Sequence, residues 1–207
     1  EMTAAYAAIA NGGVYTEPIL YTEILDHDGN VLIDNTAPET HEVIKDSTAY
    51  LLTSAMEDVV SKGTGTPAQI SNYGIAEAGK TGTTDDYKDL WFVGYTPYYT
   101  AGIWFGYDDS TLMRYRLGYN YNAHKVLWKN IMNEVLEGYE DRDFVMPSDV
   151  EKLRVCSTTG LLASYGCPTT TEYFAKDTAP TEYCSKHSYR YYQNDDDDDS
   201  SSSSDNS

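Results

Sequence analysis

Basic residues are scarce in this sequence. It has 14 Lys and Arg against 33 Asp and Glu, which gives a formal net charge of −19. Proteins that bind nucleic acids carry basic patches that neutralise phosphate groups, so this charge argues against nucleic acid as a partner. Part of the excess lies at residues 191–207, which are mostly Asp and Ser and hold little that could be buried. We predict that this acidic tail is disordered.

Long apolar runs are absent as well. A helix that spans a membrane needs about 20 consecutive apolar residues, and no stretch of this sequence approaches that length. The first residue is Glu1, and the residues that follow it already have the pattern of a helix. We therefore expect the chain to be part of a longer protein, with any targeting segment or membrane anchor upstream.

Cysteine is also scarce, and its number is odd. The three residues, Cys156, Cys167 and Cys184, all lie in the last quarter of the chain. Cys156 and Cys167 could form a disulfide in an oxidising compartment and could equally remain reduced. Together with His187 the cysteines provide four residues of the types that bind zinc, but no Cys-x-x-Cys pair is present. A disulfide or free thiols are therefore preferred over zinc, and no metal or other cofactor is predicted.

The N-terminal residues show a helix followed by a hairpin. Residues 1–11 are rich in Ala with apolar residues at helical spacing, and a Gly-Gly pair ends this helix. Strands are predicted at 18–26 and 31–33, because both segments are rich in residues that favour strands. The Asp-Gly pair within 27–30 is typical of a hairpin turn.

Two further helices have apolar stripes. One is predicted at 47–62 with Asp46 as its N-cap, and its inward stripe consists of Leu51, Leu52, Ala55, Met56, Val59 and Val60. The other is predicted at 123–136, with its inward positions at Val126, Leu127, Ile131 and Val135. Each stripe predicts a helix that packs on one side against a larger surface.

Three strands lie between these two helices, at 75–83, 89–95 and 99–107. The last two are joined by a link of three residues, so they should pair as an antiparallel hairpin. Helices that cover an antiparallel sheet make an α+β fold.

The composition changes near residue 144. We predict three regions: a domain at 1–143, a small appendage rich in Cys, Thr and Tyr at 144–190, and the acidic tail at 191–207. The appendage shows little periodicity, so we expect it to be irregular.

The segment Lys80-Thr81-Gly82-Thr83 is the motif that carries chemistry. Lys-Thr-Gly on a strand is typical of serine acyltransferases that react with penicillin. The lysine offers a positive charge, the hydroxyls can bind a carboxylate, and the glycine lets a substrate backbone lie against the strand. Alternation places Lys80 and Gly82 on one face and both threonines on the other, so all four can serve one ligand only on an edge strand that borders a cleft.

Several blocks around this motif resemble the class A, bifunctional penicillin-binding proteins of Gram-positive bacteria. They are EMTAAYAAIANGG at 1–13, AGKTGTT at 78–84, DLWFVGYTP at 89–97, AGIWFGYDD at 101–109 and WKNIM at 128–132. Residues 144–187, which contain the three cysteines, resemble the trailing segment of some members. The likeness covers nearly everything before about residue 190.

The resemblance implies both a fold and an activity. The fold would be that of penicillin-binding transpeptidases and serine β-lactamases, incomplete at its N-terminal side. Members of the family cross-link peptidoglycan outside the cytoplasmic membrane: a serine attacks the D-Ala-D-Ala bond of a stem peptide, and an amine of a second stem resolves the acyl-enzyme. β-Lactams mimic D-Ala-D-Ala and trap the serine, and an upstream helix would anchor the parent protein in the membrane.

The resemblance also assigns roles to single residues. Lys80 would lie near the nucleophile, and Thr81 and Thr83 would bind the carboxylate of substrate or drug. The backbone N–H of Thr83 would help to form the oxyanion hole. Gly82 would leave space for the substrate.

Two motifs of the family are missing from this sequence. No Ser has Lys three positions later, so the nucleophile motif Ser-x-x-Lys is absent. No Ser before Lys80 begins a Ser-x-Asn motif, and Ser204-Asp205-Asn206 in the acidic tail is a coincidence of letters. We expect both motifs upstream, and we expect the chain alone to be inactive because no acyl-enzyme can form without the serine. A D,D-carboxypeptidase, a serine β-lactamase and a non-catalytic cell-wall module remain as alternatives.

Overall fold

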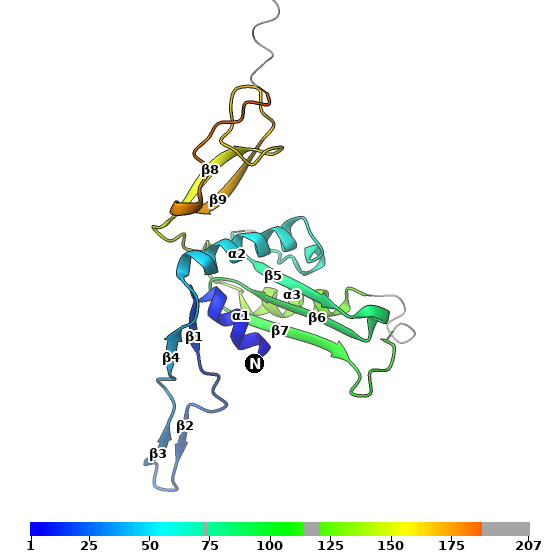
Figure 1. Cartoon of the computed structure of the whole chain (residues 1–207). Coiled ribbons are helices and arrows are strands. Elements are labelled where there is room, and N and C mark those ends of the chain that lie inside the picture. Colours follow the sequence, from blue (N-terminus) through cyan, green and yellow to red (C-terminus); the bar gives the residue numbers. More distant parts are fainter. Residues whose placement is uncertain (73, 114–120, 188–207) are drawn as a thin grey trace, which may run out of the picture. The chain divides into compact units, whose positions relative to one another are not determined.

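The computed structural model describes residues 1–72, 74–113 and 121–187 of the chain (Figure 1). The chain divides into two compact units, Glu1–Ser148 and a second one that begins at Asp149. The domain boundary that we predicted between residues 143 and 144 remains a prediction. The predicted acidic tail at 191–207 lies outside the described residues. None of the helices in the described ranges combines the length and apolar character needed to cross a membrane.

An antiparallel sheet of three strands forms the centre of the first unit. Its strands are β5 (Ala78–Thr83), β6 (Asp89–Tyr95) and β7 (Thr100–Gly106), in that order. The predicted strand at 89–95 and its hairpin with the next strand are confirmed, and Thr96 closes the turn by donating its N–H to the Tyr99 carbonyl at 2.9 Å. β5 begins later than predicted, because Ile75 forms only an isolated bridge with Arg142.

The helices α1 (Met2–Ala10) and α3 (Ala123–Val135) cover opposite faces of this sheet (Figure 1). On the α1 side, a Cβ added to Gly102 would lie 2.7 Å from the Thr3 hydroxyl, so only glycine permits this close approach. On the α3 side, the Trp128 ring meets Phe92 edge to face at 5.2 Å, and its Nε1 donates to the Ala101 carbonyl at 3.0 Å. The predicted α+β class is confirmed.

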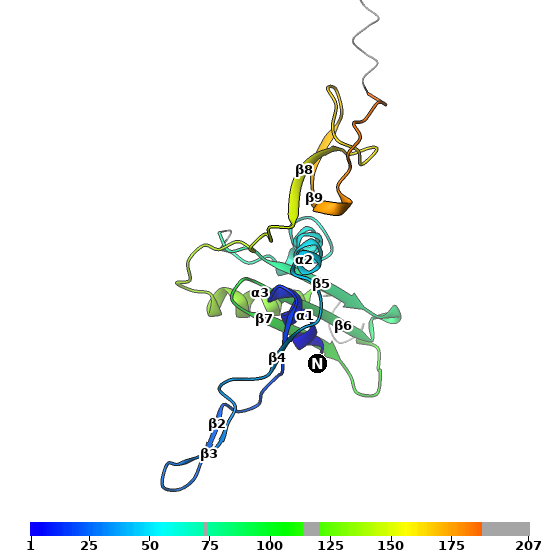
Figure 2. The ribbon, with the colours of Figure 1, turned by 60° about the vertical axis from the view of Figure 1, so that its left-hand side comes forward.

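Helix α2 (Asp46–Ser61) borders β5 and is seen nearly end-on in Figure 2. Its buried side chains include Thr53, whose hydroxyl shares a hydrogen bond of 2.8 Å with the Tyr95 hydroxyl. The predicted stripe was therefore partly wrong: Leu52 and Ala55 are exposed, because the polar Thr53 occupies an inward position once its hydroxyl has a partner. The helix also begins one residue earlier than predicted, with Lys45 as N-cap and Asp46 in the first turn.

The inward face of α3 was predicted wrongly. The four residues expected inside, Val126, Leu127, Ile131 and Val135, are 39–43% exposed. The buried residues of this face are instead His124, Trp128, Met132 and Leu136, which follow one another at intervals of four. Two apolar stripes lie side by side on this helix, and the one that contains the large Trp128 ring faces the sheet.

Residues between α1 and α2 form two small ladders. β1 (Val14–Thr16) pairs with β4 (Thr40–Glu42), and β2 (Glu23–Leu25) pairs with β3 (Val31–Asp34), both antiparallel. The hairpin between the last two was predicted correctly, but its first strand is shorter than the predicted 18–26. Before β2, the Thr22 carbonyl still accepts the Asn35 N–H at 2.7 Å, but residues 18–22 belong to no strand.

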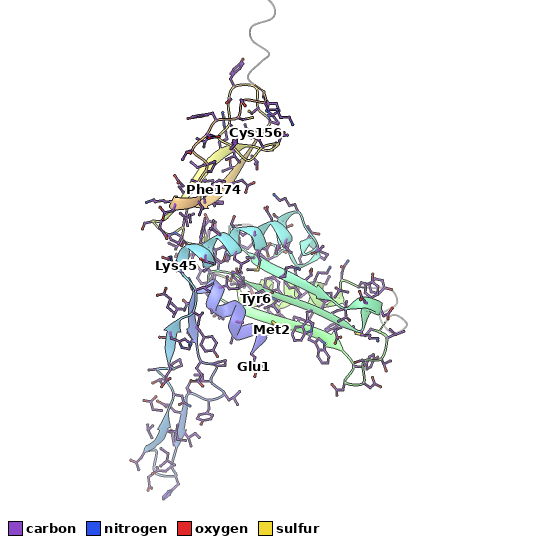
Figure 3. The ribbon with its side chains drawn as sticks, viewed as in Figure 1. Glu1, Met2, Tyr6, Lys45, Cys156 and Phe174 are labelled. Carbon is purple, nitrogen blue, oxygen red and sulfur yellow. The ribbon has the colours of Figure 1, made fainter. Side chains whose placement is uncertain are left out.

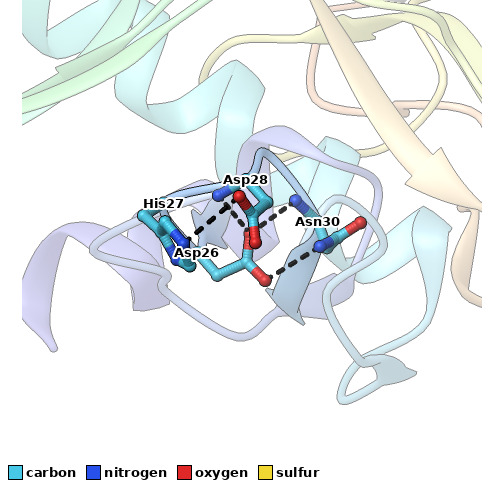
Figure 4. A network of polar contacts seen from close by, with 4 residues as sticks. All are labelled: Asp26, His27, Asp28 and Asn30. Carbon is cyan, nitrogen blue, oxygen red and sulfur yellow. Dashed lines mark hydrogen bonds and ion pairs between the residues drawn. The ribbon is translucent and has the colours of Figure 1, made fainter.

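The turn of this hairpin is held by one side chain (Figure 4). The Asp26 carboxylate accepts the N–H of Asp28 at 2.9 Å, and it accepts both the backbone N–H and the side-chain amide of Asn30 at 2.8 and 2.9 Å. Gly29 has a φ of +84°, which explains why glycine occupies this position. Local hydrogen bonds therefore fix the turn although its strands are exposed.

The second unit contains a ladder of two longer strands. β8 (Val150–Cys156) and β9 (Thr169–Ala175) pair antiparallel over seven residues each, and irregular loops connect and follow them. The sequence pattern did not predict these strands, because most of their side chains are exposed or half-buried and no clear alternation of apolar residues results.

Candidate active site

The Lys-Thr-Gly segment lies on β5, at one edge of the central sheet. β6 pairs with one side of β5, and among the described residues no strand pairs with its other side. The Thr84 N–H donates to the Asp89 carbonyl of the neighbouring strand at 3.2 Å. In an antiparallel ladder, successive residues of a strand point their backbone N–H and carbonyl groups to opposite sides of the strand. The backbone groups of Thr83 and Thr81 therefore face the free edge of β5.

The side chains of the motif alternate between the two faces, as predicted. The register Lys80 opposite Val93 and Gly82 opposite Trp91 places these two motif residues on the α1 side. The Lys80 side chain is exposed, and its Nζ donates to the Thr81 carbonyl at 2.8 Å. The ammonium group therefore bends over the free edge of the strand.

A small hollow of about 170 Å³ lies along this part of β5. Met2 and Tyr6 of α1, which are labelled in Figure 3, line it together with residues of the motif and of β6. These further lining residues are Lys80, Thr81, Gly82, Trp91 and Val93. Sites for small molecules commonly measure about 300–1,000 Å³. None of these residues is a serine or a cysteine, so the hollow has a cation and free backbone groups but no nucleophile.

Larger hollows occur elsewhere in the first unit. One of about 390 Å³ lies near Ile70 and Asn133, and one of about 360 Å³ lies near Ile9 and Phe144. Neither is lined by a residue of the Lys-Thr-Gly motif. We place the candidate site at the smaller hollow because it combines a lysine with a free strand edge.

A loop that the sequence left without a role supports the motif from the other face. The hydroxyl of Thr64 shares a hydrogen bond of 2.8 Å with the hydroxyl of Thr81. Lys125 of α3 donates from Nζ to the Thr64 carbonyl at 3.0 Å, and burial lowers the pKa of this lysine. The sequence did not indicate this role for Thr64, since a contact between residues so far apart in sequence leaves no local signal.

The end of the β5–β6 hairpin is tied by Asp89. Its N–H donates to the Thr84 hydroxyl at 2.8 Å, and its carboxylate accepts the Trp104 indole N–H at 3.0 Å. The sequence predicted Asp89 as a strand start, and its position at the first residue of β6 agrees. These bonds hold the strand that carries the motif in register with the rest of the sheet.

Comparison with known families gives two adjacent matches. Residues 1–132 match the family described as the penicillin binding protein transpeptidase domain. Residues 146–189 match the family described as the penicillin-binding protein 1A, C-terminal domain. The first match alone covers more than half of the chain and includes the whole central sheet.

Curated relatives are called penicillin-binding protein 1A. The one from Clostridium tetani is 33% identical over 192 residues, which are 90% of this chain and 24% of that protein. The one from Aquifex aeolicus is 34% identical over 188 residues, which are 89% of this chain and 25% of that protein. The chain thus spans about a quarter of the length of the relatives that it matches.

Solved structures have the same fold. Penicillin-binding protein 1A from Haemophilus influenzae has a TM-score of 0.71 at 24% identity, over 88% of this chain and 32% of that one. The penicillin-binding protein PonA1 from Mycobacterium tuberculosis has a TM-score of 0.63 at 29% identity, over 71% of this chain and 40% of that one. Family match, relatives and fold agree, and the chain belongs to the penicillin-binding protein transpeptidase family.

Proposed function

We propose that this chain is the C-terminal part of a peptidoglycan D,D-transpeptidase that cross-links stem peptides through a serine acyl-enzyme. The observation that carries the proposal is the position of Lys80-Thr81-Gly82-Thr83 on a free strand edge, beside a hollow lined by α1. The family match supports the reaction class. The serine would come from upstream sequence that precedes Glu1.

The free edge of β5 is suited to bind an extended peptide. Unpaired N–H and carbonyl groups on an edge strand can add a further strand by main-chain hydrogen bonds. Gly82 has no side chain, so the backbone of a D-Ala-D-Ala stem could approach the strand closely. The hydroxyls of Thr81 and Thr83 would bind its terminal carboxylate, and Thr81 is already held by Thr64.

The remaining roles concern charge. In the proposed reaction the serine oxygen attacks the carbonyl carbon of the D-Ala-D-Ala bond, and the terminal D-Ala leaves with a proton on its nitrogen. An amine of a second stem then attacks the ester and releases the serine. The Thr83 N–H would stabilise the oxyanion of each tetrahedral intermediate, and Lys80 would provide positive charge beside the nucleophile.

The proposal also covers the inhibitors that the parent protein would bind and the side of the membrane on which it would act. β-Lactams would acylate the same serine, and one solved structure of a relative, PonA1 at 27% identity, is described as a complex with penicillin V. Stem peptides occur outside the cytoplasmic membrane, so the parent protein would act there, anchored by an upstream helix. The chain alone would be inactive, because it has neither the serine nor its lysine.

Labelling with a fluorescent penicillin tests this function. We expect label on the protein extended upstream and none on this chain, with Lys80→Ala in the extended protein reducing the labelling rate at least tenfold. Lys62→Ala is the matched control, since Lys62 is exposed and forms only a surface ion pair with Asp58. A folded extended protein that takes no label would refute the enzymatic proposal.

A second assay separates transfer from hydrolysis. The acyl-enzyme of a transpeptidase should pass its acyl group to an added stem-peptide amine, which gives a cross-linked product. A D,D-carboxypeptidase would release the free acid instead, and a β-lactamase would hydrolyse the penicillin with turnover.

A further inference from the structure

Four side chains of metal-binding types converge in the second unit. Cys156 ends β8, Cys167 lies in the loop before β9, and Cys184 and His187 belong to the segment after residue 178. One ligand atom of each lies within 4.8 Å of those of the other three. Cys156, labelled in Figure 3, and Cys184 are buried, and Cys167 and His187 are half-buried.

The distances agree with a tetrahedral zinc site. Zinc bonds of about 2.3 Å to sulfur and about 2.0–2.1 Å to nitrogen place a tetrahedral sulfur and nitrogen about 3.6 Å apart. His187 Nδ1 lies 3.5 Å from Cys156 Sγ and 3.4 Å from Cys184 Sγ. Two sulfurs on the same ion would be about 3.8 Å apart, which is within the 4.8 Å limit that all four ligand atoms satisfy.

We propose that Cys156, Cys167, Cys184 and His187 bind one Zn²⁺ ion in a closed structural site. Three thiolates and one imidazole form a soft donor set that favours zinc over magnesium, calcium or manganese. Four protein ligands leave no open position for water or substrate, so the site would stabilise the fold and would not catalyse a reaction. The proposal is independent of the proposed transpeptidase function.

Backbone hydrogen bonds connect the segments that carry the proposed ligands, without any contribution from a metal ion. Cys156 donates its N–H to the Leu161 carbonyl at 2.8 Å, and Cys184 donates to the Leu162 carbonyl at 2.8 Å. Leu162 in turn donates to the Glu182 carbonyl at 3.0 Å. Residues 161–162 therefore lie between the end of β8 and the segment that carries Cys184. Their backbone hydrogen bonds hold ligands that are distant in sequence close to one another.

The second unit also has little other core. Between residues 149 and 187 the buried residues are Val150, Val155, Cys156 and Cys184. Units of about 40 residues or fewer usually need a metal, disulfides or oligomerisation to be stable. Two of the four buried residues are the proposed ligands, so the ion would form the centre of this small core.

A disulfide, which the sequence left open beside free thiols, accounts for less of this arrangement. A disulfide uses two cysteines with sulfurs about 2.05 Å apart, and it leaves the third thiol without a function. It also gives no reason for the imidazole of His187 to lie within 3.5 Å of two different sulfurs. One zinc ion uses all four groups.

The test is the metal content of the whole chain, purified with a mild reductant and measured by mass spectrometry of the elements. We expect one zinc per chain, and we expect Cys167→Ser and His187→Ala to lower the zinc content at least fivefold. The control is His41→Ala, because His41 is an exposed histidine on β4 of the other unit. Zinc content that stays at one per chain in both ligand variants would overturn the proposal.

A second measurement does not depend on variants that fold. In the zinc-loaded wild-type chain all three cysteines should resist alkylation, and all three should react after a strong chelator removes the ion. Replacement of zinc by cobalt should give the absorption bands of tetrahedral cobalt thiolate. A chain that contains no stoichiometric zinc and shows a disulfide in its intact mass would overturn the proposal, as would a cysteine that reacts before chelation.

Discussion

Thr83 combines two features of the candidate site in one residue, a hydroxyl on the strand face and an N–H on the free edge. The N–H faces away from β6, since its neighbour Thr84 uses its own N–H for the sheet. A residue at such a position can lose its N–H without removing a hydrogen bond from the ladder. The two features can therefore be tested separately.

Thr83→Pro in the protein extended upstream should lower the rate of acylation by penicillin about 10²–10³-fold, the effect of removing one oxyanion donor. Thr83→Ala is the control, because it removes the hydroxyl and keeps the N–H, and it should have the smaller effect on acylation. The measurement is the second-order rate constant of acylation. Equal rates for the two variants would mean that the N–H is not an oxyanion donor.

Glu77 is a half-buried carboxyl that immediately precedes β5. Burial raises its pKa from 4.5 to about 7, although the Ile70 N–H donates to it at 3.0 Å and Lys129 favours its ionised form. The folded state therefore holds the proton more tightly than the unfolded state. The stabilising effect of this group is present below about pH 4.5 and is lost as the pH rises towards 7.

Glu77→Gln keeps an acceptor for the Ile70 N–H and cannot ionise. At pH 8 we expect this variant to melt about 2–4 °C above the wild type. This is the shift that about 1 kcal/mol of stability produces in a chain of this size. The free-energy difference is set this low because part of the carboxyl remains in contact with water. At pH 4.5 the two should melt alike. Thermal unfolding at both values checks this, and an equal difference at both would show that Glu77 has an ordinary pKa.

At the scale of elements, the apolar pattern of α3 did not identify which side of the helix packs against the sheet. Ile131 and Met132 are adjacent, similar in size and apolar. Ile131 is 39% exposed, whereas Met132 is 1% exposed and belongs to the core with Phe92 and Trp128. The pattern alone favoured Ile131, and the packing on the sheet selected Met132.

Met132→Ala should lower the free energy of unfolding of this chain by about 2–5 kcal/mol, the usual cost of truncating a buried side chain. Ile131→Ala should cost about 1 kcal/mol or less, because much of this side chain is already in water. Denaturation by urea measures both. If the isoleucine variant proved the less stable of the two, the orientation of α3 described above would be wrong.

At the scale of the whole molecule, two units meet different requirements. The first unit builds a core from a sheet and three helices, with large buried side chains such as Phe92, Tyr95 and Trp128. Between residues 149 and 187, the second unit has a single ladder of paired strands and few buried side chains, so a core of this size needs another source of stability. The proposed zinc site would provide that stability, while the proposed acylation depends on a serine outside this chain.

The sequence by itself determined the motif and those elements that local signals mark, but it did not determine β8 and β9. Gly-Gly, Asp-Gly and the short link between β6 and β7 are local signals, and they placed helix ends and hairpins correctly because turn formation depends on neighbouring residues. Lys80 to Thr83 could be recognised for the same reason, since the motif is contiguous and its surrounding blocks occur in family order.

Only the tertiary structure decided which sides face inward and which distant residues meet. Thr53 is buried because Tyr95 provides its partner, Trp128 turns α3 towards the sheet, and Thr64 supports Thr81 across 17 positions of sequence. The four residues of the proposed zinc site span 31 positions and share no recognisable spacing. Such contacts form when the chain folds back on itself, and burial and hydrogen bonding select them after the local elements exist.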